Sequence, residues 1–142
     1  MKKICSFTGI NRPRFAVAIL AGFSFVFLYE YAVHAVLLAD LYGTTPDLWR
    51  GADEMQRLFS FTLGLQLLFT IALAFLFTRN FEGKGLIEGV RFGLTVGFIF
   101  AVMAFSQYAW LPISVGLAVI WAVAALVKTV ALGVLFSLLY KK

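Results

Sequence analysis

The charged residues of this 142-residue chain lie almost entirely between four long apolar stretches. The stretches cover residues 15–38, 58–77, 92–113 and 115–140, and each has about the 20 apolar residues needed to cross the hydrocarbon core of a bilayer. A composition of 62% hydrophobic and 13% charged residues agrees with this interpretation. We therefore predict an all-α integral membrane protein, a four-helix bundle that forms one transmembrane domain over residues 1–142.

The basic residues at the ends of these stretches are divided unequally between the two sides of the membrane. If the chain threads back and forth, nine fall on one side and two on the other: Lys2, Lys3, Arg12, Arg14, Arg79, Lys84, Arg91, Lys141 and Lys142 against Arg50 and Arg57. An excess of Lys and Arg beside the spans marks the cytoplasmic side. We therefore predict a multi-pass protein of the bacterial inner membrane with both termini in the cytoplasm. Anionic membrane lipids, rather than nucleic acid, are the expected partners of the net charge of +5.

Residues 39–57 are predicted to form the longest external loop. Thr45 and Pro46 are typical of a helix N-cap followed by the first helical position. Asp53 with Gln56 three residues later is typical of a capping box, here at the start of the second span.

Trp49 and Arg50 lie between these two signals, and two interpretations of them stay open. The loop is either a capped turn on the membrane surface, with Arg50 bound to a carboxylate or a lipid phosphate, or a docking surface or lid.

Small residues predict where helices approach one another. Gly93, Gly97, Ala101 and Ala104 recur at helical spacing, which favours a groove that admits another backbone. We expect this groove to serve packing within the bundle rather than a homodimer. A short helix over residues 86–91 is predicted to lead straight into the third span.

Strongly polar groups interrupt all four apolar stretches: Glu30, His34, Gln66, Gln107 and Lys128. Glu30 and His34 are four residues apart and therefore share one face of the first helix. The rise per residue places Glu30 and Lys128 close enough in depth to form a pair. An unpaired charge near the middle of a membrane costs at least ~2.5–3.5 kcal/mol, so these groups are expected to face the bundle interior.

Three interpretations of these polar residues stay open. In the first, Glu30 and Lys128 form an ion pair, and the other groups complete hydrogen bonds that lock the helices together. In the second, Glu30 and His34 form a proton relay or a ligand site, with Lys128 tuning the protonation of the glutamate. In the third, Lys128 faces outward and meets a charged group on a partner subunit.

The sequence offers no catalytic set, and we expect neither a metal nor a cofactor. His34 is a possible ligand of a metal or haem, since imidazole suits both, but it is the only histidine and Glu30 is its only neighbouring ligand. A closed zinc site needs four ligands, and haem would need another axial ligand. Cys5 is the only cysteine, which excludes an internal disulfide.

Two segments carry a resemblance to known proteins: Tyr31-x-x-His34-x-Val36-Leu37-Leu38-x-x-Leu41-Tyr42, and Thr45-Pro46-x-Leu48-Trp49-Arg50 followed by Glu54-Met55. On these residues the chain resembles a group of small bacterial four-span inner-membrane proteins of unknown function. The resemblance extends to Arg91-Phe92-Gly93 and implies a fold but no activity. It makes His34, Trp49 and Arg50 the characteristic residues, whereas Lys128 is less typical.

We expect a non-enzymatic accessory or assembly subunit of a larger membrane complex, with other membrane-protein subunits as partners. The reasons are the small mass outside the membrane, the lack of a catalytic set and the helices rich in small residues and phenylalanine. The alternative is a small-molecule or proton-handling membrane protein. Convergence of Glu30, His34 and Lys128 on a cavity favours the alternative, whereas a dry core with a flat, phenylalanine-rich outer face favours the subunit.

Overall fold

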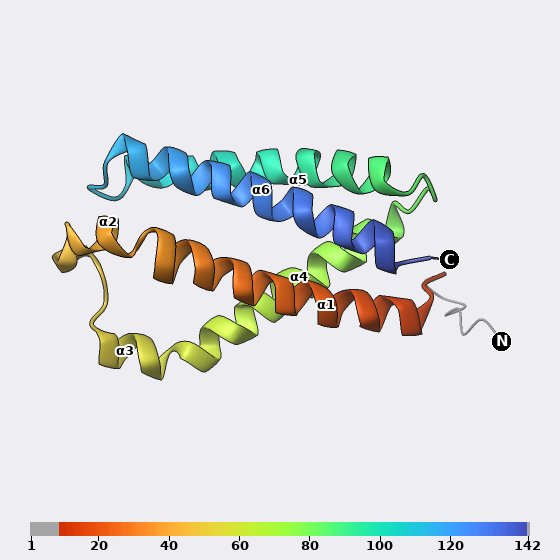
Figure 1. The fold of residues 1–142 in the computed structure, drawn as a ribbon, viewed down its shortest axis with the longest axis horizontal. Helices are drawn as coiled ribbons and strands as arrows, with labels where there is room; N and C mark the ends of the chain where they lie inside the picture. The colour runs from red at the N-terminus through yellow and green to blue at the C-terminus, as the bar shows by residue number, and fades with distance from the viewer. Residues whose placement is uncertain (1–8, 142) are drawn as a thin grey trace.

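The structure is a computed structural model that describes residues 9–141, and this part of the chain is mainly helical (Figure 1). The predictions for Lys2, Lys3, Cys5 and Lys142 lie outside the described residues. In chain order the elements are α1 (Arg12–Glu30), the π-helix η1 (Tyr31–Leu37), α2 (Ala39–Gly43), the 3-10 helix η2 (Pro46–Leu48), α3 (Ala52–Arg57), α4 (Phe59–Arg79), α5 (Leu86–Ser106), the 3-10 helix η3 (Gln107–Ala109) and α6 (Val115–Leu139).

Four helical segments are long and apolar enough to cross a membrane: Arg12–Leu37, Phe59–Arg79, Leu86–Ala109 and Val115–Leu139. The predicted all-helical fold with four such segments is confirmed. The third segment differs from the predicted 92–113, because α5 begins at Leu86 and runs on without a break, as the short helix over 86–91 had indicated. The helical segment also ends earlier than predicted: α5 ends at Ser106, and the 3-10 helix η3 continues it only to Ala109.

The bundle has two ends, which we name from the segments found there. The terminal end holds Asn11, Lys141 and the α4–α5 turn, and the loop end holds residues 38–58 and the α5–α6 turn (Figure 1). At the terminal end the Asn11 side chain donates to the Lys141 carbonyl at 3.1 Å, and the Asn11 backbone N–H donates to the Tyr140 hydroxyl at 3.2 Å. The start of α1 is thereby tied to the end of α6.

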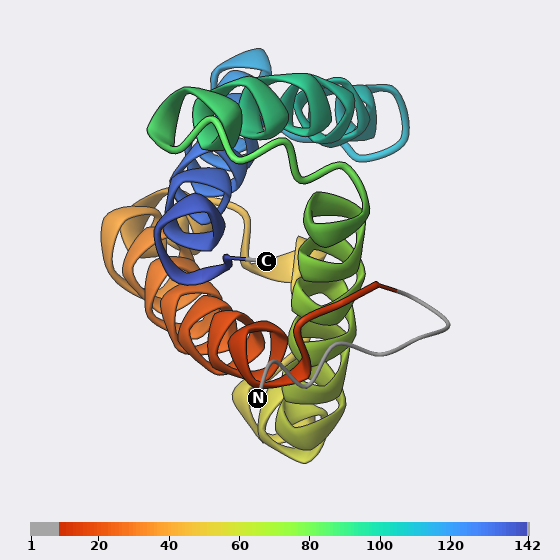
Figure 2. The same cartoon turned by 90° about the vertical axis from the view of Figure 1, so that its right-hand side faces the viewer.

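Helices α5 and α6 form a tightly packed antiparallel pair, whereas α1 crosses α4 and packs against both α4 and α6 (Figure 1 and Figure 2). Glycine allows α5 and α6 to approach closely. A Cβ atom added at Gly93 would lie 2.4 Å from the Val130 Cα, and one added at Gly89 would lie 2.4 Å from the Gly133 carbonyl oxygen. The groove predicted from Gly93 and Gly97 therefore packs within the bundle, and Gly89 extends it by one turn.

The predicted capping box of the second span is wrong. Helix α3 begins at Ala52 after Gly51, which places Asp53 inside the helix instead of at its N-cap. The chain then breaks at Leu58 before α4 starts. Pro46 does occupy the first position of a short helix, as predicted, although the Thr45 side chain makes no capping hydrogen bond.

Two clusters of buried apolar side chains stabilise the bundle. The larger one includes Phe77, Leu132, Phe136 and Tyr140 towards the terminal end, and the smaller one includes Leu117 towards the loop end. The polar residues of the spans lie between these two clusters.

Candidate functional site

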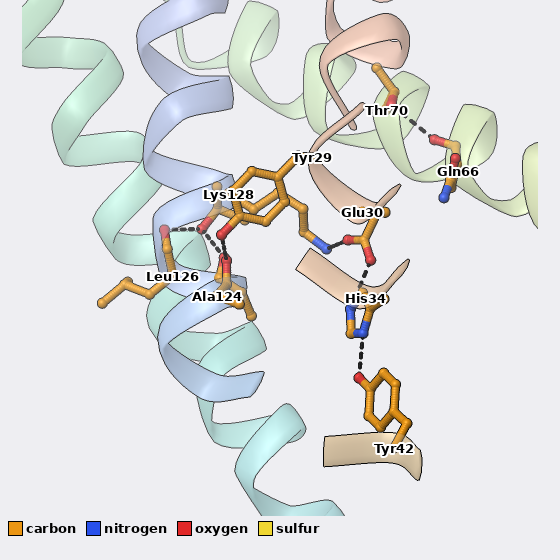
Figure 3. A network of polar contacts seen from close by, with 11 residues as sticks. Tyr29, Glu30, His34, Tyr42, Gln66, Thr70, Ala124, Leu126 and Lys128 are labelled. Carbon is orange, nitrogen blue, oxygen red and sulfur yellow. Dashed lines mark hydrogen bonds and ion pairs between the residues drawn. The ribbon is translucent and has the colours of Figure 1, made fainter. Parts of the chain in front are cut away.

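Glu30 and Lys128 form an ion pair between α1 and α6. The Lys128 Nζ donates to the Glu30 Oε1 at 2.5 Å, and the two side chains are 19% and 23% exposed (Figure 3). The ammonium group also lies 5.1 Å from the centre of the Phe69 ring on α4, which adds a cation–π contact. Lys128 therefore joins three of the four long helices, and it points into the bundle rather than towards a partner subunit.

His34 extends this pair towards the loop end. Its Nε2 lies 3.1 Å from the second carboxylate oxygen of Glu30, and its Nδ1 lies 2.5 Å from the Tyr42 hydroxyl (Figure 3). The Tyr42 oxygen in turn accepts a hydrogen bond of 2.9 Å from the Trp121 Nε1. The result is a continuous chain of polar contacts from Lys128 to Trp121.

The contacts of this chain fit two states of His34: an imidazolium that donates at both nitrogens, and a neutral form with the following hydrogen-bond directions. Trp121 can only donate, so the Tyr42 oxygen accepts and its O–H is free to donate to the His34 Nδ1. A neutral imidazole that accepts at Nδ1 carries its proton on Nε2, which then donates to Glu30. Burial raises the pKa of Tyr42 above its ordinary value, so the hydroxyl keeps the proton that it donates. We assign this neutral Nε2–H tautomer to the proton-free state of His34.

A π-helix carries His34. Helix α1 ends at Glu30, and the chain continues as η1 with a hydrogen bond from the Leu38 N–H to the Val33 carbonyl, five residues back. π-helical turns are rare and occur frequently at functional sites. This segment contains neither proline nor glycine, so no sequence signal predicted it.

Three hollows meet at His34. One of 220 Å³ lies against α5 and α6 and is lined by Glu30, Gln107 and Lys128 among others. A second of 300 Å³ lies between α1 and α4, and a third of 530 Å³ lies at the loop end beside Tyr42 and Trp49. The His34 side chain is 44% exposed, so it is the part of the site that a small molecule reaches most readily.

The two glutamines do not join Glu30, His34 and Lys128 in a single group. Gln107 lines the 220 Å³ hollow together with Lys128. Gln66 lies on α4 and lines the 300 Å³ hollow on the other side of Glu30 (Figure 3). The Gln66 Oε1 is buried and has no hydrogen-bond partner among the described residues. The cluster predicted from five residues is therefore a bonded group of three with one glutamine on each side.

The two predicted loop residues, Trp49 and Arg50, make different kinds of contact. The ring centres of Trp49 and Tyr42 lie 4.9 Å apart, and the Trp49 Nε1–H donates to the Tyr42 carbonyl. Trp49 therefore helps to hold Tyr42 in place. Arg50 is exposed and pairs with Glu54, one of the two partners predicted for it. Whether either residue docks a partner stays a prediction. Tyr42 and Trp121 were missed as site residues, because aromatic residues near a span end also fit an ordinary interfacial position.

A second polar cluster closes the α4–α5 turn at the terminal end. The buried Glu88 carboxylate accepts from the backbone N–H groups of Glu82 and Lys84 at 2.5 and 2.9 Å. The hydrogen bond from Lys84 lowers the pKa of Glu82, and Arg91 acts in the same direction. These contacts account for the polar groups structurally. No group of three His, Cys, Asp or Glu side chains suited to a metal occurs in residues 9–141.

Comparisons with protein-family models, curated proteins and solved structures gave no match for this chain. The function therefore has to follow from the chemistry of the site.

Proposed function

We propose that the chain is a proton-handling protein of the bacterial inner membrane, with its terminal end in the cytoplasm, in which His34 takes up and releases a proton from the loop end. The observation that carries this proposal is the continuous chain of contacts from Trp121 through Tyr42 and His34 to Glu30 and Lys128. The orientation is supported by the described basic residues, which are more numerous at the terminal end.

The group is suited to carry one extra proton. With a neutral His34, the charges of Glu30 and Lys128 cancel, and the carboxylate lies 3.1 Å from Nε2. A proton that arrives through the Tyr42 hydroxyl binds at Nδ1 and creates an imidazolium next to that carboxylate. Fully buried apolar side chains, including Leu132 and Phe136, lie beyond Lys128 towards the terminal end. The relay therefore opens to one side, as expected for a proton that is bound and returned rather than conducted.

A pH jump on a solid-supported membrane tests this function. Proteoliposomes that contain the protein should give a transient current when the pH on the loop side falls, because protons enter part of the membrane field to reach His34. His34→Asn should reduce the displaced charge at least about tenfold, since His34 is the only histidine in the chain. The protein must carry an affinity tag without histidine.

Gln107→Leu is the matched control, because it changes a polar group that lines the same hollow but lies outside the relay. This variant should keep the full transient. A transient that survives in His34→Asn would contradict the proposal. A sustained current in the wild-type protein would also contradict it, because it would require a path through the apolar core.

Tyr42→Phe should slow the transient without reducing the total displaced charge. The substitution removes the hydroxyl that passes the proton to Nδ1 but leaves the imidazole and its carboxylate partner in place. We expect the rise of the current to slow by about 100-fold, the lower end of the range typical for a positioned proton-transfer group. Time-resolved recording of the same pH jump measures it, and an unchanged rise would show that protons reach His34 by another route.

The accessory-subunit function is the second candidate, and the exposed apolar side chains on the first half of α4 favour it. Phe59, Phe61, Leu65 and Leu68 are exposed around this part of the helix. Purification from native membranes in mild detergent, followed by mass spectrometry, tests it. Companion proteins at fixed stoichiometry would support this function, and a protein that elutes alone would oppose it.

A further inference from the structure

A groove runs along the surface where α1 crosses α4, and its character changes from polar to apolar along its length. Its polar part is the 300 Å³ hollow lined by Glu30, His34, Thr62 and Gln66. An apolar hollow of 500 Å³ adjoins it, and Phe27 and Phe59 line both. The apolar part is also lined by Phe23, Ser24, Leu28 and Leu63.

The apolar part of the groove opens sideways, into the region that lipid occupies in a membrane. Leu28 and Phe59 border it and are 63% and 51% exposed. A molecule with a hydrocarbon tail can therefore enter from within the bilayer without passing either end of the bundle. The head of such a molecule would reach the polar part beside Glu30 and His34.

Gln66 supplies an unsatisfied hydrogen-bonding group in the polar part. Its side-chain oxygen has no partner, and the neighbouring hydroxyls are already engaged: Thr62 donates to the Leu58 carbonyl and Thr70 to the Gln66 backbone carbonyl. Lys128 and His34 are both directed at Glu30, and neither donates to the Gln66 oxygen. The torsion that turns a glutamine amide is broad, so the amide can present its oxygen or its NH₂ group to the groove. A buried amide oxygen without a donor is unfavourable, which gives a donor-bearing ligand an advantage.

The charge of the site limits the head group further. Glu30 and Lys128 neutralise each other, and the assigned His34 tautomer is neutral. A charged head would lose its hydration in the membrane without meeting an opposite charge that is free. A hydroxyl fits best, because it is uncharged and donates to the unpaired amide oxygen.

We propose that this groove binds an uncharged amphiphile with a hydroxyl head, such as a long-chain alcohol or a diacylglycerol. The hydroxyl bonds to Gln66 beside His34, and the hydrocarbon tail lies along Phe23, Phe27 and Leu63. The inference rests on the proposed function in taking the proton-binding residues as part of the ligand site, but binding and proton uptake are measured separately.

Photolabelling in phosphatidylcholine nanodiscs tests the proposal. Two probes with a diazirine in the tail, a long-chain alcohol and a diacylglycerol, are each compared with their own O-methyl ether, which cannot donate. We expect crosslinks within residues 23–28 and 59–63, with about fivefold more label from a hydroxyl probe than from its ether, as expected for one net hydrogen bond. The probe that gives the larger ratio identifies the source of the hydroxyl.

Three variants make the test specific. Gln66→Leu should bring the ratio to about one, whereas Gln107→Leu, the matched change in the other hollow, should leave it unchanged. Leu28→Trp fills the groove from an exposed position and should reduce labelling by both hydroxyl probes. Equal labelling by alcohol and ether in the wild-type protein, or labelling spread over other helices, would overturn the proposal. The two hypotheses fail separately: a proton transient that survives in His34→Asn would refute the proposed function, and hydroxyl-selective labelling of the same protein would still support this inference.

Discussion

Lys128→Met should destabilise the protein by about 2–3 kcal/mol, and Glu30→Gln in the same chain should restore most of that loss. The single substitution leaves the Glu30 carboxylate without its ammonium partner inside the bundle, where an unpaired charge is costly. The double variant has no charge left at this position. Unfolding by SDS in mixed micelles, followed by tryptophan fluorescence, measures the free energies of all four proteins.

The exposed pair of Glu82 and Lys84 provides the matched control. These residues have the same side-chain types and lie 2.7 Å apart, but they are 40% and 58% exposed. Glu82→Gln and Lys84→Met should each change the free energy of unfolding by much less than Lys128→Met does, because water screens an exposed pair. A coupling energy of about 1–3 kcal/mol is expected for Glu30 and Lys128. Additive losses at these two positions would mean that the ion pair does not hold α1 to α6.

Gly93→Ala should also destabilise the protein, by about 1–3 kcal/mol, although it adds a single methyl group. That methyl group would lie 2.4 Å from the Val130 Cα and 2.7 Å from the Thr129 carbonyl oxygen. Both are backbone atoms, so α5 and α6 must move apart along their contact. The same SDS titration measures the loss.

Gly64→Ala gives the opposite result from the same chemical change. Gly64 lies inside α4, and an added Cβ would meet nothing within 4 Å. Alanine favours a helix over glycine by about 1 kcal/mol, so this variant should be as stable as the wild type or slightly more stable. Equal losses at both positions would show that glycine flexibility, rather than close packing, is what matters at Gly93.

Local patterns predicted the parts of the fold that depend on them. The length and composition of the apolar stretches identified four candidate spans, and the separation of Glu30 and His34 by four residues placed them on one face. The pairing of Lys128 with Glu30 was one of three interpretations that stayed open, and the cost of burying a charge without a partner favoured it. Apolar character, charge and spacing along the chain can all be read from the sequence without knowing how the helices are arranged.

The rest depends on how helices are arranged. Gln66 and Gln107 have suitable depths but lie on opposite sides of α1, which no spacing along the sequence could show. The role of Tyr42 depends on a turn in the chain after η1 that brings its hydroxyl back to His34. The break at Leu58 was hidden because the residues on both sides of it favour helices.

The π-helix η1 has a consequence for how the sequence can change. A π-helical turn holds about one residue more than an α-helical turn, so Tyr31–Leu37 is equivalent to an α-helix that has gained an insertion. If the same seven residues were wound as a regular α-helix, everything that follows would be rotated by about one residue, or roughly 100°. Tyr42 would then turn away from His34 and from Trp121. The π-helical winding of this segment therefore sets the register between the loop and the ion pair, and losing one residue together with the π-turn would change that register little.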